Sequence, residues 1–446
     1  MVGGKGAGGL ENFSVAPSPG TGFPWGIPLT SRTHAVPSSA PPAASALLRR
    51  VVLPFAAGYF LSYLYRTVNA VLAPEIGRAI HLDGSDIGLM TGIYFMTFAA
   101  AQLPLGILLD RFGPRRVESL LLCFAAAGAF AFSLADSVPA LVVGRALVGF
   151  GVSSCLMAAL KANVQFFPPQ RIPLMNGIIL GAGGLGAIAA TAPVQAALHL
   201  TDWRGVYAGV ALLTLAAASF LWLTVPDRPQ AAGAGGLRVQ IAEVAEIYRD
   251  PGFWRVAPAT MLSMGSFMSI QGLWAGPWLR DVAGFTPDQS ATGLTVMAAA
   301  MALGYLSVGA MAERLEKLGV PAITQGAVGM ALHVLALGAM AAGWSAAPLT
   351  LAAFYGLTGT ACSINYAVLT RRFPLRLAGR VNTSLNLTIF VAAFIIQWGL
   401  GAMIGLWDKV DGRWPPMAWA VGLGVPTGLT LLALLWQVPA CRAEKP

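Results

Sequence analysis

Long apolar runs separated by short polar connections make up most of this chain. A helix that crosses the hydrocarbon core of a bilayer needs about 20 mostly apolar residues, and about twelve runs of this kind lie between Val51 and Val438. We place them at residues 51–73, 87–109, 117–135, 139–164, 174–198, 205–225, 255–279, 289–312, 320–342, 347–369, 379–405 and 416–438. The pattern predicts an all-α integral membrane protein with one transmembrane helix in each run.

Composition and charge placement agree with this prediction. Of the 446 residues, 56% are hydrophobic and only 11% are charged, whereas soluble domains carry about 25% charged residues. Outside the apolar runs, Lys and Arg fall mainly in alternate connections: Arg49 and Arg50, Arg111 to Arg116, Arg171, Arg228 to Arg249, Arg314 and Lys317, Arg371 to Arg380, and Arg442 and Lys445. The other connections hold only Arg78, Arg204, Arg280, Lys409 and Arg413.

This asymmetry is the positive-inside bias, and it predicts an inner-membrane or plasma-membrane protein with both termini in the cytoplasm. The net charge of +9 is therefore explained by topology, and no nucleic-acid partner is expected. Residues 1–45 are rich in Gly, Pro and Ser without an apolar signal segment, so we expect a disordered cytoplasmic tail or a misplaced start site. Residues 441–446 are expected to form a short cytoplasmic tail. The four cysteines have no metal-like spacing and are interpreted as free thiols, so no metal or cofactor is expected.

Similar short patterns recur about 206 residues apart. Phe167-Pro168 matches Phe373-Pro374, and Gly106-x-x-x-Asp110-Arg111 recurs in weaker form, a few residues out of step, as Gly309-x-x-x-Glu313-Arg314. The repetition predicts two pseudo-symmetric six-helix bundles, at 46–225 and 254–440. Between them, the polar linker 226–253 has apolar residues at helical spacing, which fits either an amphipathic helix on the membrane surface or a simple tether.

The connection between the second and third runs reads GILLDRFGPRR. This stretch, together with Gly144-Arg145 in the fourth run, resembles the signatures of the major facilitator superfamily. The resemblance implies a secondary transporter that works by alternating access, with its substrate site between the halves near the bilayer midplane, as expected for repeats that rock against each other. It also implies that Asp110 pairs with an arginine and caps a neighbouring helix across the interface between the halves, forming a conformational latch that holds the outward-open state. The latch set is Gly106, Asp110, Arg111, Gly113, Arg115, Arg116, Glu313 and Arg314.

Charged residues inside membrane spans are costly and usually functional. The predicted spans hold no Asp or Glu away from their ends, but they hold three cations: Arg66, Arg145 and Lys161. Tyr63 and Asn69 lie three residues from Arg66 and share a helix face with it. The stretch is similar to the first span of organic-phosphate and organic-anion porters, in which an arginine faces the cavity and holds an anion.

A guanidinium suits this role because it pairs two oxygens of a carboxylate or phosphate at once. The alternative is that Arg66 reaches the membrane surface or binds backbone carbonyls. Arg145 and Lys161 are further substrate candidates; helix packing or a proton relay is the alternative for Arg145, and snorkelling to the surface is the alternative for Lys161.

In the second half, the same porters commonly carry a basic residue in span 7. Here Gln271 and Trp274 stand in that span, which favours a smaller or less charged anion than a phosphate ester. In span 10, Asn365 and Tyr366 are the preferred pair for orienting a substrate, although such groups also serve as interhelical hydrogen bonds.

We therefore predict a monomeric secondary transporter of a small organic anion, without a cofactor, driven by anion exchange or by proton cotransport. Polyspecific drug efflux is the main alternative, and a nitrate or nitrite porter is another because span 5 is glycine-rich; those porters, however, carry arginines in spans 2 and 8 that are absent here. A sensor that binds ligand without moving it is a third alternative. No nucleophile with an adjacent base is present, which argues against an enzyme.

Overall fold

Helices provide nearly all the regular structure of the computed structural model, which describes residues 47–228 and 237–443. The first group of helices comprises α2 (Leu53–Thr67), α3 (Asn69–Ala79), α4 (Gly84–Ser133), α5 (Val138–Gly151), α6 (Cys155–Phe166), α7 (Ile172–Ala189), α8 (Ala192–Ala197) and α9 (Trp203–Thr224). A π-helical turn, Leu48–Val52, precedes α2, and a 3-10 turn, Pro169–Arg171, precedes α7. The predicted tail at 1–45 lies outside the described residues. Of the predicted tail at 441–446, residues 441–443 belong to α18 and the rest lie outside the described residues.

The second group follows the helix α10 (Leu237–Arg249), which forms where the linker pattern allowed either a helix or a tether. It comprises α11 (Phe253–Ser269), α12 (Ala275–Asp281), α13 (Pro287–Lys317), α14 (Ala322–Ala341), α15 (Pro348–Thr358), α16 (Ile364–Arg372), α17 (Ala378–Ile404) and α18 (Pro416–Ala443). Shorter turns are the π-helical turn Ile270–Trp274 and the 3-10 turns Ala361–Ser363 and Leu375–Leu377. All twelve predicted spans are helical, which confirms the predicted all-α fold of two six-helix halves.

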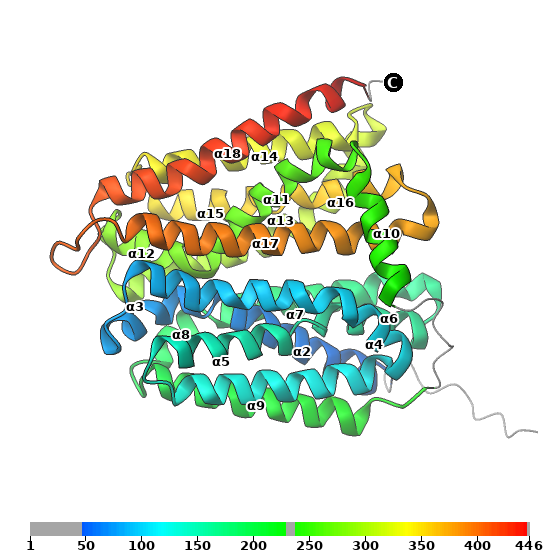
Figure 1. Cartoon of the computed structure of the whole chain (residues 1–446), viewed down its shortest axis with the longest axis horizontal. Helices are drawn as coiled ribbons and strands as arrows, with labels where there is room; N and C mark the ends of the chain where they lie inside the picture. Colours follow the sequence, from blue (N-terminus) through cyan, green and yellow to red (C-terminus); the bar gives the residue numbers. More distant parts are fainter. Residues whose placement is uncertain (1–46, 229–236, 444–446) are drawn as a thin grey trace, which may run out of the picture. The chain divides into compact units, whose positions relative to one another are not determined.

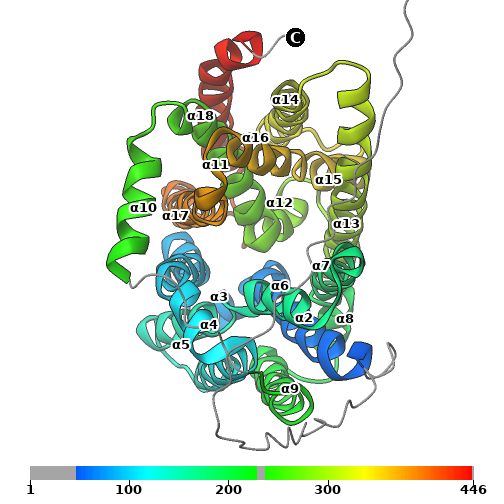
Figure 2. The same cartoon turned by 90° about the vertical axis from the view of Figure 1, so that its right-hand side faces the viewer.

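The two groups lie side by side with their helices running along a common direction (Figures 1 and 2). Contacts between the groups run chiefly between α4 and α17 and between α7 and α13, while α3 meets α12 and the turn Ile270–Trp274. Helix α10 lies across one end and packs on both α17 and α4 (Figure 2). We call this end the linker end and the opposite end the distal end.

Four spans are interrupted in a symmetric way. Eight helices of the described residues are long and apolar enough to cross a membrane, with the second and third spans joined in α4. Spans 1, 7 and 10 are absent from that set because a turn at Val68, the π-helical turn Ile270–Trp274 and the 3-10 turn Ala361–Ser363 interrupt their regular α-helical hydrogen bonding, although the backbone stays in the right-handed helical region. Span 4 has a similar irregularity between α5 and α6. Spans 1 and 4 correspond to spans 7 and 10 in the repeat. These irregularities fall in corresponding spans of the two halves.

The GILLDRFGPRR stretch forms the sharp reversal between the second and third spans. Gly113 interrupts α4 there with φ 81° and ψ 161°, a backbone conformation that residues other than glycine rarely adopt. The predicted connection is therefore present, and Gly113 is required by the backbone geometry of the turn itself.

Candidate functional site

A cavity of about 340 Å³ lies between the two groups of helices. Its walls come from α2, α4, α6 and α7 of the first half and from α11, α13, α16 and α17 of the second. The side chains that matter for its chemistry are Arg66, Tyr59, Tyr63, Phe98, Gln102, Met157, Met264, Met268, Met301, Tyr305, Ser363, Tyr366, Asn386 and Phe390. We call this the central cavity. Pockets of this size between helices are typical of small-molecule sites.

Arg66 is the cationic group of the central cavity. Its side chain is only 6% exposed, and its guanidinium carbon lies 4.5 Å from the ring centre of Tyr63, 5.5 Å from that of Phe390 and 5.7 Å from that of Phe98. None of the ion pairs within the described residues includes Arg66, and its Nε atom has no hydrogen-bond partner there. Aromatic faces stabilise the cation but leave its bidentate N–H donors available for an anion.

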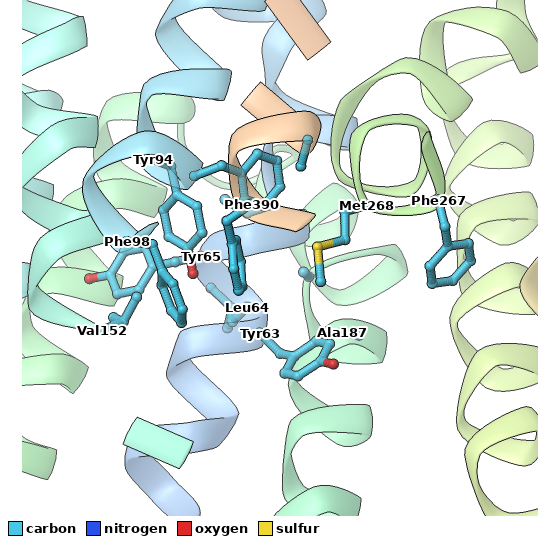
Figure 3. Packing of buried hydrophobic residues seen from close by; sticks show 14 of the residues in the cluster. Tyr63, Leu64, Tyr65, Tyr94, Phe98, Val152, Ala187, Phe267, Met268 and Phe390 are labelled. Carbon is cyan, nitrogen blue, oxygen red and sulfur yellow. The ribbon is translucent and has the colours of Figure 1, made fainter. Parts of the chain in front are cut away.

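Phe98 and Phe390 join the two halves beside Arg66. Their rings stack with centres 4.3 Å apart and an interplanar angle of 25°, and they come from α4 and α17. Figure 3 shows the two rings face to face, with Tyr63 and Met268 nearby. Because the rings belong to opposite halves, any rocking of the halves must change the surroundings of Arg66.

Of the nine predicted substrate-binding residues, Arg66, Tyr63 and Tyr366 line the central cavity. The Tyr366 hydroxyl donates to Oδ1 of Asn386, a cavity residue on α17. Gln102 also reaches the cavity, and its Nε2 donates to the Ser153 carbonyl at 3.3 Å. Neither Gln102 nor Tyr59 was proposed from the sequence, and only the partner helices reveal that they face the cavity.

Asn69 and Arg145 lie outside the cavity wall, inside the first half. Arg145 is fully buried, and its Nη1 donates to the Tyr65 carbonyl at 2.9 Å and to the Tyr207 hydroxyl at 3.4 Å. The Tyr207 hydroxyl donates to Oδ1 of Asn69 at 2.6 Å, and Nδ2 of Asn69 donates to Thr91 at 3.0 Å. This network links spans 1, 2, 4 and 6. In this conformation Arg145 therefore serves helix packing, which was the alternative to substrate contact.

Lys161 is paired with the predicted latch. Its Nζ donates to Oδ1 of Asp110 at 2.6 Å and to the Leu109 carbonyl at 2.7 Å. Asp110 therefore pairs with a lysine of its own half here, whereas the sequence led us to expect an arginine and a contact across the halves. The substrate role expected for Lys161 is not supported by its position, because its ammonium group is already neutralised by Asp110.

The other predicted substrate ligands of the second half also lie outside the central cavity. Nε2 of Gln271 donates to the Met301 sulfur at 3.1 Å, and the Trp274 indole donates to the Gln397 carbonyl at 3.1 Å. Nδ2 of Asn365 donates to Thr260 at 2.8 Å. All three side chains are buried and do not line the central cavity. Trp274 instead lines a separate cavity of about 60 Å³ together with residues of the first half.

The remaining latch residues of the first half mainly anchor the reversal at Gly113. Nε and Nη2 of Arg115 donate to the Trp222 carbonyl at 3.0 and 2.7 Å, and Arg116 pairs with Asp227. Arg111 is exposed over the Phe112 ring. Gly106 is the latch residue of the first half that lies next to the second half. A Cβ at this position would lie 3.4 Å from Nη1 of Arg380 on α17.

The second half repeats the Asp110 pair with a different acid. Glu316 pairs with Arg371 at 2.6 Å and joins α13 to α16, as Asp110 joins α4 to α6. Glu316 stands 206 residues after Asp110, at the offset of the sequence repeat. Glu313 instead pairs with Lys317 one turn along its own helix at 2.7 Å, and Arg314 is exposed. The counterpart of Asp110 is therefore Glu316, and the assignment to Glu313 is corrected.

One buried acid escaped the sequence analysis. Glu118 on α4 is fully buried, and its carboxyl group lies beside the Cys155 thiol, with which it shares a hydrogen bond. Its carboxyl group occupies the space that a side chain at Gly58 would fill. The hydropathy pattern placed Glu118 at the edge of the third span, and that edge position hid its burial.

The distal end is closed by direct contacts between the halves. Thr191 and Thr295 share a hydrogen bond of 2.8 Å, and the Trp398 indole donates to Ser85 at 3.1 Å. The backbones at Gly84 and Gly401 approach too closely for a side chain on either residue. The central cavity is thus sealed from the distal end in this conformation.

Two helical halves around a buried cationic cavity, closed at one end, define a membrane transporter. The family model of the Major Facilitator Superfamily matches residues 55–397, and the chain belongs to that family.

Curated relatives of the chain have several different names. The nitrate/nitrite transporter NrtP of Nostoc punctiforme is 31% identical over 180 residues, which are 39% of this chain and 36% of that protein. The probable sulfoacetate transporter SauU of Cupriavidus necator is 25% identical over 275 residues, 58% of this chain and 63% of that protein. The transcription regulatory protein OpdE of Pseudomonas aeruginosa is 25% identical over 312 residues, 69% of this chain and 74% of that protein. The chain thus spans less than two thirds of NrtP and of SauU.

Solved structures share the fold. A bacterial homologue of the human lysosomal transporter Spinster, inward-facing and unoccupied, aligns with a TM-score of 0.68 at 20% identity over 88% of this chain and 95% of that one. The nucleoside transporter NupG aligns with a TM-score of 0.70 at 13% identity over 86% and 98%. These similarities show the fold and do not identify the substrate.

Proposed function

We propose that the chain is a secondary transporter that carries a small organic anion by alternating access. The observation that carries this proposal is Arg66, a buried guanidinium in the central cavity that has aromatic neighbours and no ion-pair partner among the described residues. A buried charge without a counter-ion is costly, and a bound anion would supply the missing charge.

The rest of the cavity wall favours an organic anion over an inorganic one. Four methionines line it, together with the rings of Tyr59, Tyr305 and Phe390. Methionine and aromatic side chains adapt to apolar ligand surfaces. We therefore assign the anionic group of the substrate to Arg66 and Tyr63, and its apolar part to the methionine-rich wall. A carboxylate or sulfonate on a small carbon skeleton has both features.

The predicted topology places the linker end in the cytoplasm, so closure at the distal end corresponds to an inward-facing state. Binding of the anion would remove the uncompensated charge and allow the loaded carrier to reorient. We propose a monomer in the inner or plasma membrane with both termini cytoplasmic, no nucleic-acid partner, no cofactor and no enzymatic activity.

The test begins with a thermal-shift screen of the purified protein against carboxylates, sulfonates, phosphate esters and nitrate. An anion should stabilise the native chain, and Arg66→Met should weaken that binding about 10- to 100-fold, because hydrogen bonds to charged groups contribute about 1.5–3 kcal/mol. Arg66→Lys should retain part of the affinity. Arg171→Gln is the matched control, since it removes one exposed positive charge outside the cavity.

Uptake or exchange in proteoliposomes then separates transport from binding alone. Loss of uptake in Arg66→Met with a normal folded yield supports the proposal. Stabilisation by a neutral drug that Arg66→Met does not alter would instead support drug efflux, which the methionine-rich wall also suits. Binding without transport by the native chain would support a ligand sensor.

A further inference from the structure

Several of the few positively charged residues in the distal connections line the same small cavity. The positive-inside bias leaves few Lys and Arg residues at the distal end. Three of them, Arg78, Arg280 and Lys409, line one cavity of about 60 Å³. Arg78 and Arg280 also line an adjoining cavity of about 240 Å³. Neither cavity shares a residue with the central cavity, so these cations are separate from the Arg66 site.

Acidic groups near these cations compensate them only in part. Asp281 lies 3.8 Å from Arg280 and also accepts from the Trp414 amide at 3.3 Å. Glu75 lines the larger cavity. Burial lowers the pKa of Arg280, and the charges of Arg78 and Arg413 lower it further, although Asp281 opposes the shift.

The Lys409 ammonium is in a similar environment. It lies 4.3 Å from the ring centre of Trp414. Burial is the main cause that lowers its pKa, and Arg280 adds to the shift while Asp281 and Asp83 oppose it. No acid is among the described residues that line the smaller cavity, so its three cations face a partly desolvated space, where electrostatic interactions are stronger than in water.

The cluster is assembled from both halves. Arg78 lies on α3, Arg280 ends α12, and Lys409 belongs to the connection between α17 and α18. Helices α3 and α12 are in contact (Figure 1). A Cβ at Gly276 of α12 would overlap the carbonyl oxygen of Ala70 on α3, so the two backbones approach closely. The cations converge because the distal end is closed, and closure brings like charges together.

We propose that Arg78, Arg280 and Lys409 form an anion-binding site at the distal end, the distal anion site, which takes a small oxyanion such as sulfate or a carboxylate. The anion bridges Arg78 of the first half to Arg280 and Lys409 of the second and stabilises the distal-closed conformation. It acts on the conformational equilibrium and is not the ligand of Arg66, so the site does not rest on the proposed substrate.

A cysteine at Thr191 reports on this equilibrium, because Thr191 is buried in the contact with Thr295 and becomes accessible when the distal end opens. The rate at which a thiol reagent labels purified Thr191→Cys protein is measured in sulfate and in chloride at constant ionic strength. The native chain corrects for labelling of its own cysteines. We expect sulfate to slow labelling about fivefold or more, the effect of about 1 kcal/mol of coupling.

Variants in the Thr191→Cys background locate the effect. Arg78→Gln combined with Arg280→Gln should abolish it, and Lys409→Gln, a substitution in a connecting segment, should weaken it even if the double variant fails to fold. Arg204→Gln is the charge-matched control, because Arg204 pairs with Asp136 away from both cavities.

Arg66→Met should retain the sulfate effect even if it abolishes transport. Equal labelling in sulfate and chloride would overturn the proposal. Persistence of the effect in the folded Arg78 and Arg280 double variant, or its loss in Arg66→Met alone, would also overturn it.

Discussion

Removing the hydroxyl of Tyr207 tests whether Asn69 and Arg145 serve structure or substrate. In Tyr207→Phe, Oδ1 of Asn69 loses a 2.6 Å hydrogen bond, while Nη1 of Arg145 loses a long contact of 3.4 Å and keeps the Tyr65 carbonyl. A buried polar atom without its partner costs about 1–3 kcal/mol, but hydrogen bonds between membrane helices average about 0.6 kcal/mol. We expect a loss of about 1–2 kcal/mol, mostly from Asn69.

The assay is unfolding of the purified protein in SDS, followed by far-ultraviolet circular dichroism. Tyr65→Phe is the matched control: its hydroxyl bonds Thr214 at 2.8 Å, and Thr214 still donates to the Val210 carbonyl when the tyrosine hydroxyl is removed. Because no charged group or amide is left without a partner, Tyr65→Phe should cost only about 0.5 kcal/mol.

Ligand affinity decides between the two interpretations. If the network is structural, Tyr207→Phe lowers stability and leaves the affinity for a stabilising anion within about twofold, a free-energy difference of less than 0.5 kcal/mol. A loss of affinity of tenfold or more with unchanged stability would refute the structural assignment and return Asn69 to the substrate site.

Three further predictions follow from close contacts. Gly186→Ala should reduce folded yield, because its Cβ would overlap the Phe60 carbonyl, whereas Gly177→Ala has open space and should express normally by fluorescence size-exclusion chromatography. Asp110→Ala should alter the rate of interconversion between conformations but not the affinity within each, as measured by labelling of an engineered cysteine. Glu118→Gln should fold in native yield, since the amide has the same shape and can still form a hydrogen bond with Cys155; a sharp loss of yield would show that the carboxyl group itself is essential.

The sequence predicted the membrane spans well because the cost of burying polar backbone in lipid acts on each segment separately. It also identified Arg66 and Tyr63, which share a face of one uninterrupted helix. Tyr63 and Asn69 lie three residues before and after Arg66, so at 3.6 residues per turn they are rotated from it by about 60° in opposite directions. That rotation is enough to turn Asn69 from the cavity toward Tyr207 and Thr91.

Two other predicted substrate ligands, Gln271 and Asn365, lie outside the cavity for reasons of local helix geometry. Gln271 lies in the π-helical turn Ile270–Trp274, and such a turn shifts the register on which helical periodicity depends. Asn365 and Tyr366 were preferred as a pair, but neighbouring residues on a helix point about 100° apart. Only Tyr366 faces the cavity, and Asn365 turns to Thr260.

The acids show most clearly why burial cannot be inferred from hydropathy. Hydropathy locates a residue along the membrane normal, whereas burial depends on which neighbours surround it. Glu118 is enclosed because Gly58 on α2 has no side chain, and nothing in the sequence around Glu118 predicts that neighbour. The predicted spans held no acid away from their ends, so the sequence offered no membrane carboxyl for proton coupling. Since Glu118 is buried but does not line the central cavity in this conformation, any proton that it carries must be exchanged in another conformation. A comparison of the pH dependence of uptake in Glu118→Gln and the native chain therefore tests coupling separately from anion binding at Arg66.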